Sequence, residues 1–124
     1  MTVEHTLIAV VDDDESVRES LLDLLRSFGF ASLAFSSAEE FLISDCIDNA
    51  ICLILDVAMP GMSGPELQRE LLRRRHTVPI VFITAHADES LRLRLLEQGA
   101  VECLDKPFSD TDLLEVLQFV SRLR

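Results

Sequence analysis

The chain alternates short apolar runs with segments whose apolar residues recur every three or four positions. Five runs have the length of a β-strand, and those at 7–11, 51–55 and 80–83 are almost continuous in aliphatic residues. Such strands are typical of a parallel sheet that is covered on both faces. With the runs at 31–35 and 101–104, they predict a five-stranded parallel sheet. Because a helical segment follows each strand, right-handed crossovers should place helices on both faces, giving a doubly wound (βα)5 α/β fold.

Local start and stop signals predict five helices, one after each strand. Serine or aspartate residues stand at N-cap positions, some with an acid three residues later, and glycines stand at two expected helix ends. Asp14 and Glu15 should lie at the start of the first helix, where a negative charge stabilises the helix dipole. The remaining signals are Gly29, Ser37 with Glu40, Ser63 with Glu66, Asp88 with Gly99, and Ser109 with Asp112.

The length and charge of the chain limit its function class. Its 124 residues suit a single domain spanning 1–124, with no output domain inside it. The net charge is −11, which would repel a phosphate backbone, so we expect no direct nucleic-acid binding. No signal-like or membrane-spanning run is visible, and Cys46, Cys52 and Cys103 form no CxxC pair. We expect a cytoplasmic protein whose cysteines are small buried residues.

Polar side chains gather at the ends of the predicted strands, at the edge where doubly wound sheets bind ligands. Asp12 and Asp13 follow the first strand, Asp56 the third, Thr84 the fourth and Lys106 the fifth. Three carboxylates held together either raise the pKa of one of them or recruit a cation, and an oxygen-only ligand set suits Mg²⁺, for which Mn²⁺ could substitute. A lysine and a hydroxyl beside them are the groups that stabilise a transferring phosphoryl group. Asp56 is then a candidate nucleophile.

The strings VVDDDESVRESL, LILDVAMPGMSG, VFITAH and LDKPF together resemble the receiver domain of two-component response regulators. MPGMSGPEL and GAVECLDKPF are most similar to the FixJ-like branch. The resemblance implies a flavodoxin-like receiver fold that takes a phosphoryl group from a histidine kinase or phosphotransfer protein. It implies that Asp56 is the phosphoacceptor, Asp13 a direct Mg²⁺ ligand, and Asp12 a partner that holds the ion, often through water. The backbone carbonyl of Ala58 would complete the protein ligands.

The resemblance also assigns Thr84 and Lys106 to phosphoryl binding and implies a cis Lys106–Pro107 bond. The family usually has an aromatic residue three positions before the lysine, and it swings when the threonine moves. Here that position is Cys103, so we expect this relay to be weak or replaced. His86 either overhangs the site and affects hydrolysis of the acyl-phosphate, or is a solvated loop histidine.

The family uses the region 88–122 for dimers and partners, so a phosphorylation-dependent homodimer is expected there. Opposite charges could pair across a symmetric interface or could simply form a solvated face. These charges are Arg92 and Arg94 on one helix and Asp110, Asp112 and Glu115 on the next.

Three other functions are alternatives to a phosphorylated receiver. A haloacid-dehalogenase-like phosphatase needs an acid two residues after its nucleophile, and Ala58 cannot transfer a proton. A dinucleotide-binding domain needs a glycine-rich first loop, which this chain lacks. The protein should therefore be no enzyme beyond catalysing its own phosphorylation and dephosphorylation. A non-phosphorylated pseudo-receiver that acts as an interaction module remains the alternative.

Overall fold

The computed structural model describes residues 7–86 and 88–123 as an α/β sandwich built on one parallel sheet. The strand order is β2-β1-β3-β4-β5, and every pair of neighbours is parallel. The prediction of a five-stranded doubly wound sheet is confirmed, and this order is the flavodoxin-like one. The strands are β1 (Leu7–Val11), β2 (Ala31–Phe35), β3 (Cys52–Asp56), β4 (Ile80–Thr84) and β5 (Glu102–Asp105).

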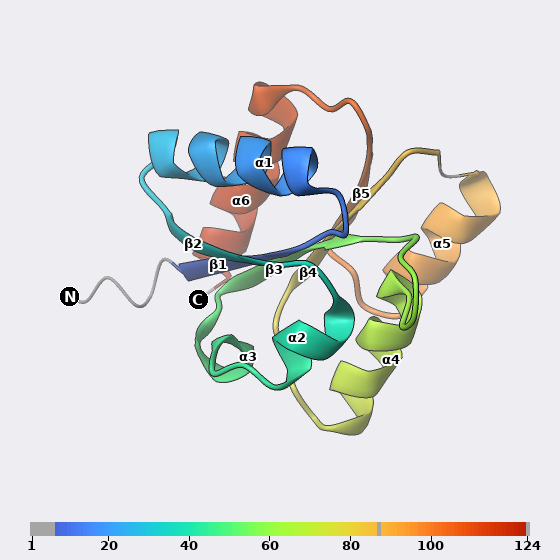
Figure 1. Ribbon diagram of the computed structural model, residues 1–124. Coiled ribbons are helices and arrows are strands. Elements are labelled where there is room, and N and C mark those ends of the chain that lie inside the picture. The colour runs from blue at the N-terminus through green and yellow to red at the C-terminus, as the bar shows by residue number, and fades with distance from the viewer. Residues whose placement is uncertain (1–6, 87, 124) are drawn as a thin grey trace.

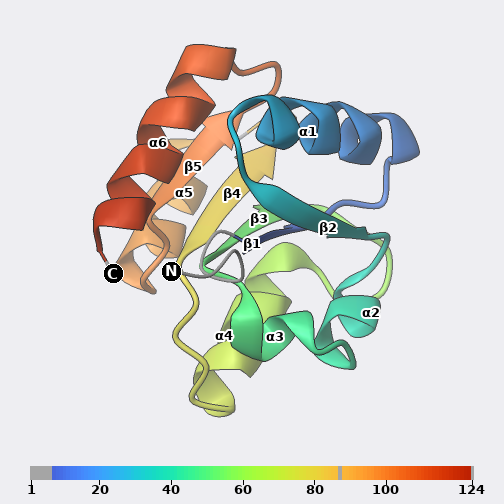
Figure 2. The same ribbon diagram turned by 90° about the vertical axis from the view of Figure 1, so that its left-hand side faces the viewer.

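Helices cover both faces of the sheet (Figures 1 and 2). One face carries α1 and α6, and the other carries α2, α3, α4 and α5. All residues of β3 and β4 are buried, which explains their continuous aliphatic sequence. The helices are α1 (Glu15–Ser27), α2 (Ala38–Leu42), α3 (Cys46–Asn49), α4 (Gly64–Arg73), α5 (Glu89–Glu97) and α6 (Asp110–Arg122).

The predicted caps are found where the sequence placed them. The Asp14 carboxylate accepts hydrogen bonds from the first turn of α1, and Ser63 with Glu66 forms a capping box at the start of α4. Gly29 and Gly99 each follow a helix with a positive φ, at +92° and +108°. These helix ends are therefore encoded by the residues immediately around them.

The prediction of one helix per crossover was wrong for the second crossover, which holds two short helices. Ser44 ends α2 because its backbone N–H and its hydroxyl both donate to the Phe41 carbonyl, at 3.1 and 2.7 Å. The chain then turns at Asp45 and begins α3. The third and fifth strands also begin and end one residue later than predicted, so Asp56 and Asp105 lie inside the sheet.

The three cysteines are buried and unpaired, as predicted. Within residues 7–86 and 88–123, no helix has both the length and the apolar character needed to cross a membrane.

Candidate functional site

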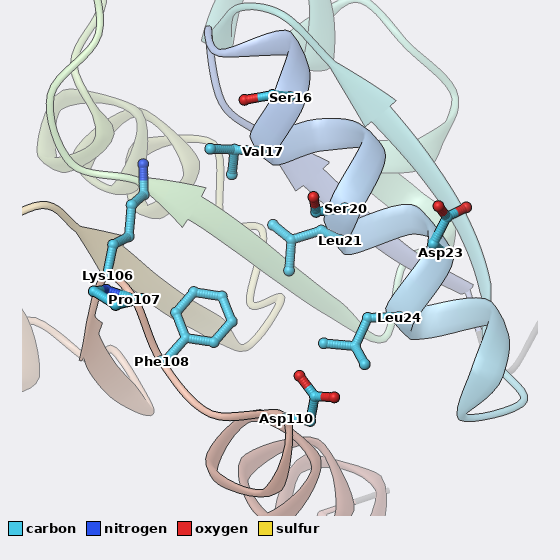
Figure 3. A pocket seen from close by; sticks show the side chains of 10 residues that line it. All are labelled: Ser16, Val17, Ser20, Leu21, Asp23, Leu24, Lys106, Pro107, Phe108 and Asp110. Atoms are coloured by element: carbon cyan, nitrogen blue, oxygen red, sulfur yellow. The ribbon is translucent and has the colours of Figure 1, made fainter.

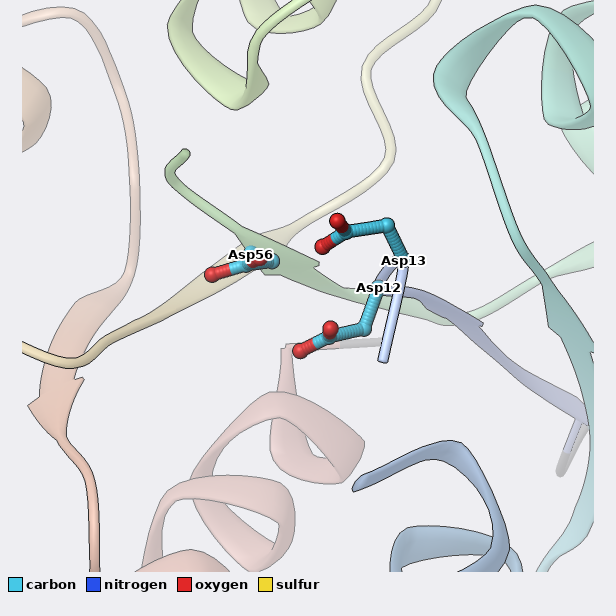
Figure 4. A group of neighbouring side chains, drawn as sticks. All are labelled: Asp12, Asp13 and Asp56. Atoms are coloured by element: carbon cyan, nitrogen blue, oxygen red, sulfur yellow. The ribbon is translucent and has the colours of Figure 1, made fainter. Parts of the chain in front are cut away.

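The sheet brings Asp12 and Asp56 together at the point where its strand order reverses. β1 pairs with β2 on one side and with β3 on the other, and the register joins Val11 to Leu55. In both segments the next residue along the chain is an aspartate. One carboxylate oxygen from each of Asp12, Asp13 and Asp56 lies within 4.8 Å of the others (Figure 4). The predicted acidic cluster is therefore assembled.

The three carboxylates differ in burial. Asp12 is 0% exposed and Asp56 is 5% exposed, whereas Asp13 lies at the surface. Both oxygens of Asp12 have protein partners, since Oδ1 accepts a hydrogen bond from Asp14 N–H at 2.8 Å and Oδ2 accepts one from Lys106 Nζ at 3.0 Å. Asp12 is thus fixed from two sides.

Lys106 places one positive charge beside this cluster. Its Nζ lies 3.0 Å from Asp12 Oδ2 and 3.5 Å from Asp56 Oδ1. Its backbone N–H donates to the Thr84 carbonyl at 2.7 Å, which extends the β4–β5 pairing to the lysine. The Lys106–Pro107 peptide bond is cis, as the family resemblance implied.

Burial and charge shift the ionisation of both groups. Burial, followed by the charge of Asp12, raises the pKa of Asp56 to about 6, although Lys106 opposes the change. For Lys106, burial acts to lower the pKa, but the hydrogen bond to Asp12 and the charges of Asp56 and Asp12 outweigh it, and the pKa is raised. Lys106 therefore stays charged, while the Asp56 carboxylate is held at an electrostatic cost.

Thr84 ends β4 at the same edge and is 5% exposed. Its hydroxyl is occupied by the following loop, donating to the His86 carbonyl and accepting from the His86 N–H, both at 3.3 Å. The His86 residue itself is exposed. The Thr84 hydroxyl must leave the His86 backbone before it can donate to a ligand in the crevice.

Comparison with known protein families assigns the chain to one of them. The family model described as the response regulator receiver domain matches residues 8–118. The chain belongs to the response regulator receiver domain family. It is therefore a signalling module of two-component phosphorelays, and its relatives include FixJ.

Curated relatives of this receiver domain are about twice its length. Nodulation protein W of Bradyrhizobium diazoefficiens is 46% identical over 111 residues, which are 90% of this chain and 49% of that protein. Transcriptional regulatory protein FixJ of Azorhizobium caulinodans is 38% identical over 115 residues, 93% of this chain and 54% of that protein. The chain spans about half the length of both relatives.

Solved structures agree with the fold. The response regulator StyR is 46% identical with a TM-score of 0.87, covering 94% of this chain and 59% of that one. FixJ-N is 38% identical with a TM-score of 0.83, covering 94% of this chain and 93% of that one.

Three residues that shape the receiver site were missed by sequence reasoning. Arg18 Nη1 donates to the Asp12 carbonyl at 2.9 Å, and the Glu39 carboxylate accepts from Met62 N–H at 3.2 Å, holding the loop after β3. Gly64 touches Asp56, because a β-carbon there would overlap the Asp56 carbonyl oxygen. Of these three, only the Arg18 contact could have been predicted from the sequence. Helical side chains lean toward the N-terminus of their helix, so an arginine in the first turn of α1 can contact the residues that precede the helix.

Two further predicted positions are Ala58 and Cys103. Ala58 is exposed in the loop after β3, two residues beyond Asp56. The Cys103 side chain is 1% exposed and belongs to the core between the sheet and α5, with Leu95 and Ala100. Cys103 therefore occupies an interior position in the receiver domain.

A groove of about 830 Å³ opens next to Lys106, between α1 and the segment that leads into α6 (Figure 3). Its apolar surface comes from α1 on one side and from Pro107 and Phe108 on the other. The α1 side contributes Val17, Leu21 and Leu24. An apolar surface groove therefore lies next to the lysine of the acidic cluster.

Proposed function

We propose that Asp56 accepts a phosphoryl group from a phosphohistidine of a sensor kinase or phosphotransfer protein. The observation that carries the proposal is the setting of the Asp56 carboxylate. It is fixed at the end of β3, 3.5 Å from Lys106 Nζ, with Asp12 and Asp13 oxygens within 4.8 Å. The apolar groove beside Lys106 is the surface we assign to the donor protein.

The donor set fits a hard divalent cation. Three carboxylates crowd one crevice with a single lysine between two of them, and all the candidate ligands are oxygens. Asp13, Asp56 and the Ala58 carbonyl would hold Mg²⁺ or Mn²⁺ directly, and Asp12 less directly because its oxygens already have partners. When bound, the ion neutralises charge on the carboxylates and on the phosphoryl oxygens.

The chain's own residues then carry out the transfer. An Asp56 carboxylate oxygen attacks phosphorus, a P–O bond forms, and the P–N bond breaks with its electron pair going to the leaving imidazole. The Lys106 ammonium shifts from Asp12 and Asp56 toward a phosphoryl oxygen, and the Thr84 hydroxyl leaves the His86 backbone to donate to another. His86 is a candidate modulator of the later hydrolysis, because its position depends on the bonds that Thr84 gives up.

The signal would be a changed affinity for a partner or for a second copy through residues 88–122. Longer relatives such as FixJ are named as transcriptional regulators, so we propose that this receiver domain regulates an attached or separate output. Sedimentation of phosphorylated protein at high micromolar concentration and low salt should show dimers. A persistent monomer would remove dimerisation from the proposal.

The chemistry is tested by labelling. With Mg²⁺ and radiolabelled acetyl phosphate, the protein should gain one acid-stable, alkali-labile phosphoryl group, and Asp56→Asn should gain none. Asp45→Asn is the matched control, because Asp45 is exposed, makes no side-chain capping hydrogen bond and should not affect labelling. Label on Asp56→Asn would contradict the assignment, and an unlabelled wild type would favour the pseudo-receiver alternative.

A further inference from the structure

The guanidinium of Arg92 reaches from α5 to the outer edge of β5. It donates one hydrogen bond to the Cys103 carbonyl through Nη1 and another to Asp105 Oδ2 through Nη2, at 3.2 Å. Nη1 also lies 3.9 Å from Glu102 Oε1. The Arg92 side chain is 26% exposed, so these contacts are partly shielded from water. A residue expected to pair between molecules thus has its partners within its own chain.

The contact with Cys103 is made to backbone at an open sheet edge. β5 is the last strand, and in a parallel strand the N–H and C=O of one residue point to the same side. The Cys103 N–H donates to Glu102 Oε1 at 2.9 Å, and its carbonyl accepts from Arg92. An exposed ion pair to Asp105 alone would be weak, but a bond to the strand itself fixes α5 against β5.

Arg92 also lies between two parts of the proposed phosphoryl site. The loop that holds the Thr84 hydroxyl leads into α5, which is capped by Asp88, and the Asp88 carbonyl accepts from Arg92 N–H at 3.1 Å. On the other side, Asp105 immediately precedes Lys106. Arg92 therefore connects the segment that Thr84 must release to the strand that carries the lysine.

We infer that Arg92 is a positioning residue that straps α5 to β5 and passes movement of the Thr84 loop to the strand bearing Lys106. This inference rests on the proposed phosphorylation of Asp56. When the loop moves, the first turn of α5 moves with it, and the guanidinium displaces the Cys103 carbonyl and the Asp105 carboxylate together. The Cys103 side chain is too small to transmit the movement by changing its own position, as the larger aromatic side chain usual in the family does. The movement therefore passes through the Cys103 backbone carbonyl.

The test compares Arg92→Met, which keeps the aliphatic chain but removes the donors, with Arg94→Met on the exposed side of α5. Amide hydrogen exchange is followed in α5 and β5 with and without beryllofluoride and Mg²⁺, a phosphoryl mimic. In the wild type and Arg94→Met, the mimic should change exchange at Leu104 and Lys106 by about fivefold or more, the lower end of usual coupling. In Arg92→Met, exchange in α5 should still change when the mimic is added. The ratio of the exchange rates with and without the mimic at Leu104 and Lys106 should fall to near one.

Two outcomes overturn the inference. One is an equal β5 response in Arg92→Met and the wild type. The other is faster β5 exchange in Arg92→Met with its response to the mimic undiminished, which would make Arg92 an edge cap only. If beryllofluoride affects no segment of the wild type, the proposed chemistry at Asp56 has failed. In that case the positioning role of Arg92 is tested on the ligand-free proteins. If Arg92 positions Lys106, the Lys106 amide should exchange about fivefold faster in Arg92→Met than in the wild type, and at the wild-type rate in Arg94→Met.

Discussion

Removing the charge of Asp56 should stabilise the metal-free protein, because that carboxylate is buried beside Asp12. Its pKa rises from 3.8 to about 6 on folding. Each pKa unit corresponds to about 1.4 kcal/mol, so ionised Asp56 destabilises the folded state by roughly 2–3 kcal/mol at neutral pH. Asparagine has almost the same shape and no charge. Asp56→Asn should therefore raise the free energy of unfolding by about that amount, or the melting temperature by roughly 3–5 °C per kcal/mol.

The pH dependence identifies the cause. The folded wild type binds the Asp56 proton more tightly than the unfolded chain does, so its stability relative to Asp56→Asn falls as pH rises between about 4 and 6. The difference between the two proteins should be small near pH 4, grow through pH 6 and then level off. Saturating Mg²⁺ should reduce the difference in the free energy of unfolding between the two proteins, since the ion binds the three-carboxylate site of the wild type more tightly.

Urea unfolding at a series of pH values, in the presence of a chelator, measures this difference. Asp45→Asn is the control, because Asp45 is exposed and makes no side-chain capping hydrogen bond. It should show no such pH profile. Two results would refute the electrostatic reasoning. One is that Asp56→Asn and the wild type have the same free energy of unfolding at neutral pH, and the other is that they differ as much at pH 4 as at neutral pH.

Three further predictions concern the surroundings of the site. Mg²⁺ at a hundredfold excess over its Kd should stabilise the wild type by ~2.7 kcal/mol and Asp13→Asn far less; an unchanged wild-type melting temperature would count against Asp13 as a ligand. Gly64→Ala should cost roughly 1–3 kcal/mol in urea unfolding and slow labelling of Asp56, since the new β-carbon overlaps the Asp56 carbonyl, whereas an unaltered midpoint would show that α4 adjusts freely. Cys103→Phe should also cost roughly 1–3 kcal/mol, because Cys103 is buried against α5, yet leave the labelling rate of Asp56 nearly unchanged; a strong loss of labelling would place Cys103 in the chemistry.

Much of this protein was predictable from its sequence because the relevant signals are local. The strands follow from continuous aliphatic runs, and α1 and α4 begin where Asp14 and Ser63 cap them. The convergence of Asp12, Asp13 and Asp56 also follows, since parallel strands with crossovers bring their carboxyl ends to one edge. The break between α2 and α3 was missed because Ser44 competes with the helix only in the conformation that the folded crossover adopts.

Tertiary structure alone decided how the charges and donors at that edge are distributed. The sequence shows three carboxylates, but only packing makes Asp12 fully buried and gives both of its oxygens partners. It also places the Arg92 guanidinium against the β5 edge of its own chain. These contacts join residues far apart in the chain, and their geometry depends on how the helices pack against the sheet. A local pattern therefore encodes which groups meet, while packing determines which of them remain available to a ligand.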